Sequence, residues 1–102
     1  VRSGFWTGVA KPGFRRRLEE EVLPVLKLLP GVSGARILWP DQLEDNPPDI
    51  ACQVLVEFDQ REDVDRMMAS PERDAFRALV ADVANELFEG RISHINYQVG
   101  GN

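Results

Sequence analysis

The segment Ala69-Ser70-Pro71-Glu72-Arg73 constrains the fold most, because one helix has to end there and another has to begin. Ser70 is a typical N-cap residue, and Pro71 suits the first helical position, where an N–H would have no partner in any case. Glu72 places a negative charge at the positive end of the helix dipole. The chain around this break therefore divides into elements in the order strand, helix, strand, strand, broken helix, strand.

The spacing of hydrophobic residues predicts which of the other segments are helices or strands, and where each begins and ends. Apolar residues recur at intervals of three and four over residues 14–29, which predicts an amphipathic helix. Pro24 should kink it near residues 20–23, because a proline ring clashes with the carbonyl group four residues earlier. The other predicted elements are strands over residues 3–10, 32–40, 50–58 and 91–99, helices over residues 59–69 and 71–89, and a polar loop over residues 41–49. Gly90 is predicted to be the C-cap of the last helix.

This order of elements predicts the α+β class. Two strand–helix–strand halves with right-handed crossovers form a ferredoxin-like βαββαβ fold, in which a four-stranded antiparallel sheet carries all its helices on one face. The second helical region is broken at Ser70-Pro71, and residues 1–102 form a single domain.

The alternation of side chains assigns the faces of the sheet. Cys52, Val54, Val56 and Phe58 form an apolar set that is predicted to face the helices. The more apolar set of the last strand is predicted to do the same, which leaves Ile92, His94 and Asn96 on the open face. That face would also carry Leu55 and either Ile37 or Leu38. So much apolar surface predicts a homodimer through the open sheet face, which buries about 800 Å² or more per subunit.

Composition excludes several classes of function. The 12 Lys and Arg residues and 17 Asp and Glu residues give a net charge of −5 without a basic stripe, so no nucleic-acid partner is expected. No apolar run approaches the roughly 20 residues that cross a bilayer, so no membrane partner is expected. One cysteine and one histidine allow neither an intrachain disulfide nor a set of softer metal ligands. We therefore expect a cytoplasmic protein without a metal.

Five segments together resemble a known superfamily. They are Lys11-Pro12-Gly13, Leu29-Pro30-Gly31-Val32, Val54-Leu55-Val56-Glu57-Phe58, Ser70-Pro71-Glu72-Arg73 and Gly90-Arg91-Ile92-Ser93-His94-Ile95-Asn96-Tyr97. This pattern resembles the dimeric α+β barrel superfamily and, within it, the antibiotic-biosynthesis-monooxygenase-like domains. The resemblance implies two sheets that close into one barrel, with a small-molecule pocket between sheet and helices in each subunit. Members include cofactor-independent oxygenases, haem-degrading enzymes and lactone isomerases. Haem-binding members share a helical histidine that this chain lacks, so no cofactor is expected.

A few residues could carry chemistry. His94 is the one side chain whose ordinary pKa lies near neutrality, which makes it the candidate general base. Asn96 is the second candidate catalytic residue, and both Asn96 and Arg36 could polarise or hold the anionic oxygen of a phenolate or enolate. Trp6, Trp39 and Tyr97 could frame a small aromatic ligand. Each has a structural alternative: His94 as a hydrogen-bonded core or interface residue, the aromatic residues as core, and Arg36 as an ion-pair partner.

Two functions remain open from the sequence. One is a small-molecule enzyme that resembles cofactor-independent monooxygenases and acts on aromatic or enolisable substrates. The other is a non-catalytic dimeric module that binds a ligand or a protein. An enclosed pocket lined by His94 or Asn96 and an aromatic side chain would favour the enzyme.

Overall fold

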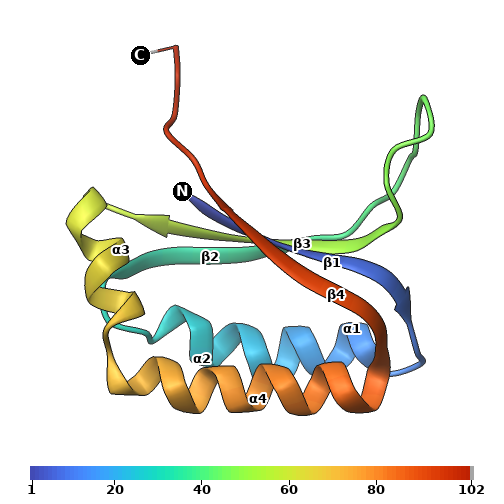
Figure 1. Cartoon of the computed structure of the whole chain (residues 1–102), viewed down its shortest axis with the longest axis horizontal. Coiled ribbons are helices and arrows are strands. Elements are labelled where there is room, and N and C mark those ends of the chain that lie inside the picture. The colour runs from blue at the N-terminus through green and yellow to red at the C-terminus, as the bar shows by residue number, and fades with distance from the viewer. Residues whose placement is uncertain (102) are drawn as a thin grey trace.

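One four-stranded antiparallel sheet with helices on a single face forms the protein in the computed structural model, which describes residues 1–101 (Figure 1). The strand order is β2-β3-β1-β4, which confirms the ferredoxin-like α+β fold. The strands are β1 (Arg2–Ala10), β2 (Val32–Leu38), β3 (Ile50–Phe58) and β4 (Phe88–Asn96). The helices are α1 (Phe14–Arg17), the π-helix η1 (Leu18–Val22), α2 (Leu23–Lys27), α3 (Arg61–Met68) and α4 (Pro71–Leu87).

The helix break occurs at the predicted position. The Ser70 hydroxyl accepts a hydrogen bond from the backbone N–H of Arg73 at 3.3 Å and donates one to the Met67 carbonyl oxygen at 2.7 Å. The same side chain therefore ties the end of α3 to the start of α4. Pro71 opens α4, as its missing N–H allows.

The first helix is distorted where Pro24 predicted it. Over η1 the backbone hydrogen bonds change from the i to i−4 to the i to i−5 pattern. The N–H of Leu23 donates to the carbonyl oxygen of Leu18, five residues earlier. Pro24 is the next residue and has no N–H that could donate to the carbonyl oxygen of Glu20. The π-helical turn accommodates this missing hydrogen bond. The apolar stripe survives the distortion, because Leu18 and Val22 remain buried.

The junction between α4 and β4 differs from the prediction. The helix ends at Leu87, and the strand begins directly at Phe88, so Gly90 is a strand residue and not a helix C-cap. Gly90 pairs with Gly8 of β1, and both have positive φ angles, 151° and 145°. A Cβ atom on Gly90 would lie 2.1 Å from the carbonyl oxygen of Thr7. The glycine is required by the close approach of two backbones, which no local pattern reveals.

Buried side chains between the sheet and the helices form two clusters. The larger one contains Trp6, Phe14, Leu18, Val22, Cys52, Val83 and Phe88. The Trp6 ring meets the Phe14 and Phe88 rings edge-on, with centroids 5.1 and 5.2 Å away. The smaller cluster contains Leu26, Leu29, Val56 and Met67. Burial also raises the pKa of the Cys52 thiol to about 12.

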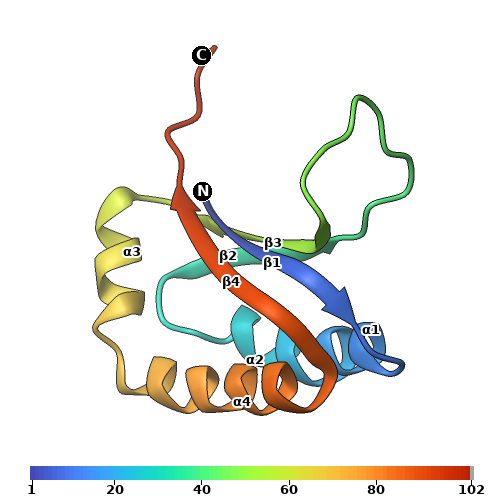
Figure 2. The same cartoon turned by 45° about the vertical axis from the view of Figure 1, so that its right-hand side comes forward.

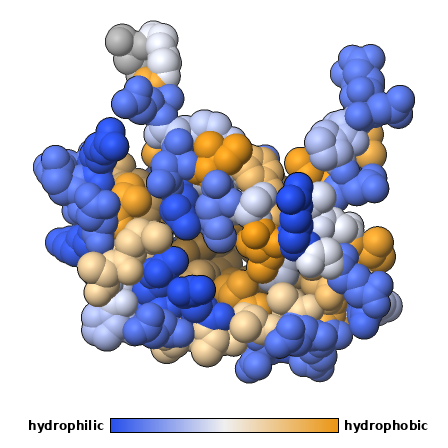
Figure 3. Space-filling model, viewed as in Figure 1, coloured by the Kyte–Doolittle hydropathy of each residue, from blue (hydrophilic) through white to orange (hydrophobic). Residues whose placement is uncertain are grey.

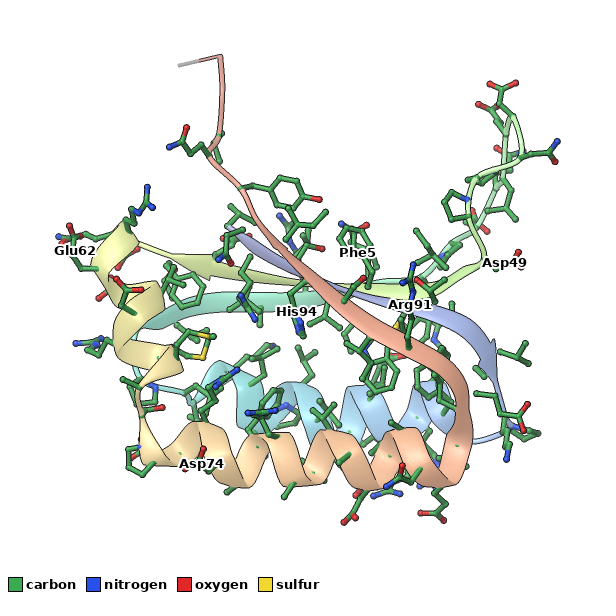
Figure 4. All side chains as sticks on the ribbon, viewed as in Figure 1. Phe5, Asp49, Glu62, Asp74, Arg91 and His94 are labelled. Carbon is green, nitrogen blue, oxygen red and sulfur yellow. The ribbon has the colours of Figure 1, made fainter. Side chains whose placement is uncertain are left out.

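Strand pairing corrects the predicted faces of β4. Directly paired residues of antiparallel strands share a face. Buried Trp6 pairs with Ile92, and Gly4 pairs with His94, so Ile92 and His94 face the helices. Figure 4 shows His94 directed from β4 towards the helices. Of the more apolar set of the predicted strand, Ile95 lies on the open face of β4 and is 47% exposed, and Tyr97, which directly follows the end of β4, is 43% exposed. The prediction was wrong because it placed the more apolar side chains of an edge strand towards the helices. The register of β4 with β1 determines which side chains face the helices.

The face assignment of β3 is confirmed. Cys52 and Val56 are buried beneath the helices, while Leu55 lies opposite Ser3 on the other face. Residues 39–49, drawn in green, and the segment after β4 both extend from the sheet on the side away from the helices (Figure 1 and Figure 2).

Candidate functional site

A cavity of about 400 Å³ lies between the sheet and the helices. Its apolar lining comes from both the sheet and the helices and includes Trp6, Leu26, Val54, Val56, Met67, Phe76 and Val80. Figure 3 shows the hollow between the sheet and α4, with hydrophobic surface inside it and hydrophilic side chains along its rim. Its volume falls in the range of small-molecule sites.

Its polar lining consists of one histidine and three arginines. His94 comes from β4, Arg2 from β1, and Arg73 and Arg77 from α4. Residues 73 and 77 are one helical turn apart, so both side chains leave the same face of α4. No Asp or Glu is among the described residues of the lining, and Glu72 and Asp74 on the same helix are exposed and outside it.

The surroundings of His94 favour its neutral form. His94 remains exposed on one side, but its partial desolvation by the cavity walls lowers the pKa of its imidazole, and the charges of Arg2, Arg73 and Arg77 lower it further. The ring lies against the backbone of β1, where a Cβ atom on Gly4 would come within 3.4 Å of its Cδ2 and Nε2 atoms. The side chain is therefore able to accept a proton at neutral pH.

Asn96 fixes the position of Arg2. The Arg2 Nη1 atom donates a hydrogen bond to Asn96 Oδ1 at 3.0 Å. Arg2 is half-buried, and the pKa of its guanidinium is lowered, first by burial and then by the charge of Arg73. Repulsion between cations is thus part of the resting site.

The structure brings together only some of the candidate residues. Trp6 and His94 line the cavity, and Asn96 reaches it through Arg2. Arg36 is elsewhere and pairs with Glu57 of the same chain at 3.1 Å. Trp39 lies under the guanidinium of Arg15, whose carbon is 4.9 Å from the ring centroid, and lines a separate hollow of about 190 Å³ beside residues 40–48. Tyr97 follows the end of β4, is exposed and lines neither hollow.

The three cavity arginines were not among the candidate residues. A signal for them exists in the sequence: Arg73 and Arg77 have the i,i+4 spacing of one helix face, and Arg2 has the same strand parity as Trp6. The signal was insufficient because nothing local indicates that these two elements converge.

Metal-site and membrane features are absent from residues 1–101. Within that range, no three His, Cys, Asp or Glu side chains gather closely enough to hold a metal ion. None of the helices described there combines the length and the apolar character needed to cross a bilayer.

The fold is shared with solved structures of low sequence identity. An ethyl tert-butyl ether D (EthD) family protein from Bacillus halodurans is similar with a TM-score of 0.74 and 11% identity, over 95% of this chain and 96% of that one. HapK from Hahella chejuensis is similar with a TM-score of 0.57 and 11% identity, over 100% of this chain and 97% of that one. No protein-family model matches the sequence, and neither does any curated protein. At this identity the two structures show that the fold of this chain is shared with them.

Proposed function

We propose that the 400 Å³ cavity is the active site of a small-molecule enzyme that resembles cofactor-independent monooxygenases and acts on aromatic or enolisable substrates. One observation carries the proposal. The single histidine of the chain lines an apolar cavity of suitable size, in surroundings that keep its imidazole neutral at pH 7.

The first chemical step is a proton transfer to His94. The neutral imidazole accepts a proton from an acidic C–H or a phenolic O–H group of the substrate. The negative charge that remains on the substrate is stabilised by the guanidinium groups of Arg2, Arg73 and Arg77, because an electrostatic interaction is strong in a partly dry cavity. Trp6 supplies part of the apolar wall against which a ring can lie.

Dioxygen completes the oxygenase form of the reaction. The substrate carbanion gives its electrons to O₂, and a methylene group together with one O₂ becomes a carbonyl group and one water molecule. The substrate itself is the reductant, so no other electron donor is needed. Asn96 acts as a positioning residue for Arg2 in this scheme.

The alternative is a binding site without chemistry. A general base is usually oriented by a third group, and no hydrogen bond found within residues 1–101 orients the His94 ring. That observation favours a module that binds its ligand unchanged.

Turnover assays separate the two functions. Wild-type protein is incubated with quinols, anthrone-type ketones and β-diketones, with oxygen uptake and loss of substrate as readouts. For the enzyme, His94→Gln should lower kcat about 100-fold or more, the usual contribution of a general base. Ser93→Ala is the matched control, because Ser93 is the neighbouring residue of β4 on the opposite face. Ligand binding without any turnover by the wild-type protein would favour the module.

We also propose that the protein is a homodimer through the open sheet face. Half-buried Phe5 and Leu55 and exposed Ile95 form an apolar surface on that face, which a second copy would cover. Sedimentation velocity at micromolar concentration should then give twice the 11.5 kDa chain mass. Leu55→Glu should produce the monomer, whereas wild-type protein that sediments as a monomer would contradict the proposal.

A further inference from the structure

Three arginines of the cavity have no counter-ion among residues 1–101. Six of the twelve Lys and Arg residues form ion pairs there, namely Lys11, Arg15, Arg16, Arg17, Arg36 and Arg66. Arg2, Arg73 and Arg77 are not in this set, although the chain holds 17 acidic residues and has a net charge of −5. Lys27, Arg61 and Arg91 also lack an ion pair among these residues, but Arg2, Arg73 and Arg77 differ from them because they line one cavity whose described lining contains no Asp or Glu.

The excess is also costly in the resting protein. Arg2 is half-buried, and the charge of Arg73 disfavours its protonated form. Arg73 is half-buried as well, whereas Arg77 is exposed, so the cost concerns mainly the first two arginines. Cations that are partly desolvated and close together destabilise a fold unless an anion joins them. Asn96 nevertheless holds the Arg2 side chain in place with a hydrogen bond of 3.0 Å. Such a cluster is typical of a site that is completed by a negatively charged ligand.

The apolar lining of the cavity indicates the chemistry of the uncharged part of the ligand. Apart from its polar groups, the cavity is lined by apolar side chains such as Val54, Val56, Phe76 and Val80, which provide contacts for hydrocarbon but not for polar groups. A simple inorganic anion would leave this apolar volume without a partner. A ligand with a hydrophobic ring system and one oxyanion at its edge satisfies both parts of the cavity.

We infer that the ligand of this cavity is an amphipathic organic oxyanion, whose anionic group is bound by Arg2, Arg73 and Arg77 and whose ring system lies against the apolar walls. The inference rests on the proposed function only in taking this cavity as the ligand site. Guanidinium groups suit the role because their planar N–H forks match the two oxygens of a carboxylate. Three guanidinium groups carry more positive charge than one developing enolate balances, which favours a ligand that is already anionic when it binds.

Two probes of the same shape test the charge. Binding of 1-naphthoate and of 1-naphthalenemethanol is measured by titration calorimetry at pH 7.5, where only the first is ionised. We expect 1-naphthoate to bind at least tenfold more tightly to the wild-type protein. Arg73→Gln and Arg77→Gln should each weaken 1-naphthoate about tenfold, as the loss of one charged hydrogen bond does, and leave 1-naphthalenemethanol within twofold.

Arg91→Gln is the charge-matched control. Arg91 lies on β4 three residues before His94, is exposed, is outside the cavity and has no ion pair among the described residues (Figure 4). Its removal lowers the net charge by the same amount but should change neither affinity more than twofold. Thermal unfolding of each variant checks that it is folded.

The single histidine gives an independent readout. His94 faces Arg2, Arg73 and Arg77, which are the charged groups of β1 and α4 that line the cavity with it. A bound anion should raise the pKa of its imidazole in an NMR titration, and the neutral alcohol should not.

The outcomes separate the two ideas. Equal affinity for both probes, or arginine variants that weaken both equally, would overturn the inference and leave the proposed function intact. Absence of binding by either probe would also overturn the inference, because the cavity would not accept a ring of this size. The proposed function would fall with it only if the turnover assays gave no activity on any of their substrates.

Discussion

Gly90→Ala tests the close approach of β1 and β4, which sets the register that turns His94 inward. Gly90 has φ = 151°, in a region that is almost confined to glycine, and a residue with a Cβ atom pays about 1–3 kcal/mol there. The new Cβ atom would also lie 2.1 Å from the Thr7 carbonyl oxygen and 2.9 Å from the Gly8 Cα atom. Both neighbours are backbone atoms of a paired strand, so neither can move without disturbing the ladder.

The combined cost should be about 3 kcal/mol or more, out of the 5–15 kcal/mol that stabilise a typical domain. For a domain of this size that loss corresponds to a fall in Tm of roughly 12–24 °C. Urea unfolding followed by fluorescence gives the free energy of unfolding, and calorimetry gives Tm. Gly100→Ala is the matched control, because nothing lies within 4 Å of a Cβ atom there. It should stay within about 0.5 kcal/mol of the wild-type protein.

Gly90→Asn distinguishes this explanation from a helix C-cap. Asparagine is the usual substitute for glycine in the left-handed conformation of a cap, so a cap would tolerate it well. A close approach between backbones would not, and Gly90→Asn should be at least as unstable as Gly90→Ala. A loss below 1 kcal/mol in Gly90→Ala, or a clear rescue by asparagine, would refute the reasoning.

Four further predictions follow from burial, capping and titration. Leu18→Ala removes a fully buried side chain and should lower the free energy of unfolding by about 2–5 kcal/mol, as urea unfolding would report. Ser70→Ala removes an N-cap and should cost about 1 kcal/mol, and Ser70→Thr should recover most of it in the same assay. Cys52, with a pKa of about 12 and full burial, should react with a thiol reagent only as fast as the protein unfolds, so rapid labelling of native protein would contradict its burial. The pKa of His94 is lower in the folded protein than in the unfolded chain, so the unfolded chain binds a proton first as the pH falls below about 6.5. The free energy of unfolding should therefore decrease from that pH down to the folded pKa. His94→Gln should reduce this decrease, as urea unfolding at pH 5–7.5 would report.

Local chemistry was enough to predict the order and type of the elements. The cap at Ser70, the proline at position 24 and the alternation in β3 act within a few residues of themselves, so the sequence alone predicts the helix break, the distorted first helix and the helix-facing side of β3. Their sum predicts the ferredoxin-like fold. His94 and Trp6 could be selected as candidate residues on chemistry alone.

Tertiary structure decided what depends on segments distant in the chain. Pairing between β1 and β4 turned His94 towards the helices. The close approach of Gly8 and Gly90 belongs to a strand that begins at Phe88, so α4 ends earlier than its own sequence indicates. The packing of α4 against the sheet placed Arg73 in the same cavity as Arg2, 71 positions earlier in the sequence, and made one basic site from residues that no local pattern connects. Periodicity and capping measure preferences within one turn or one strand, whereas register and convergence are set by the packing of whole elements.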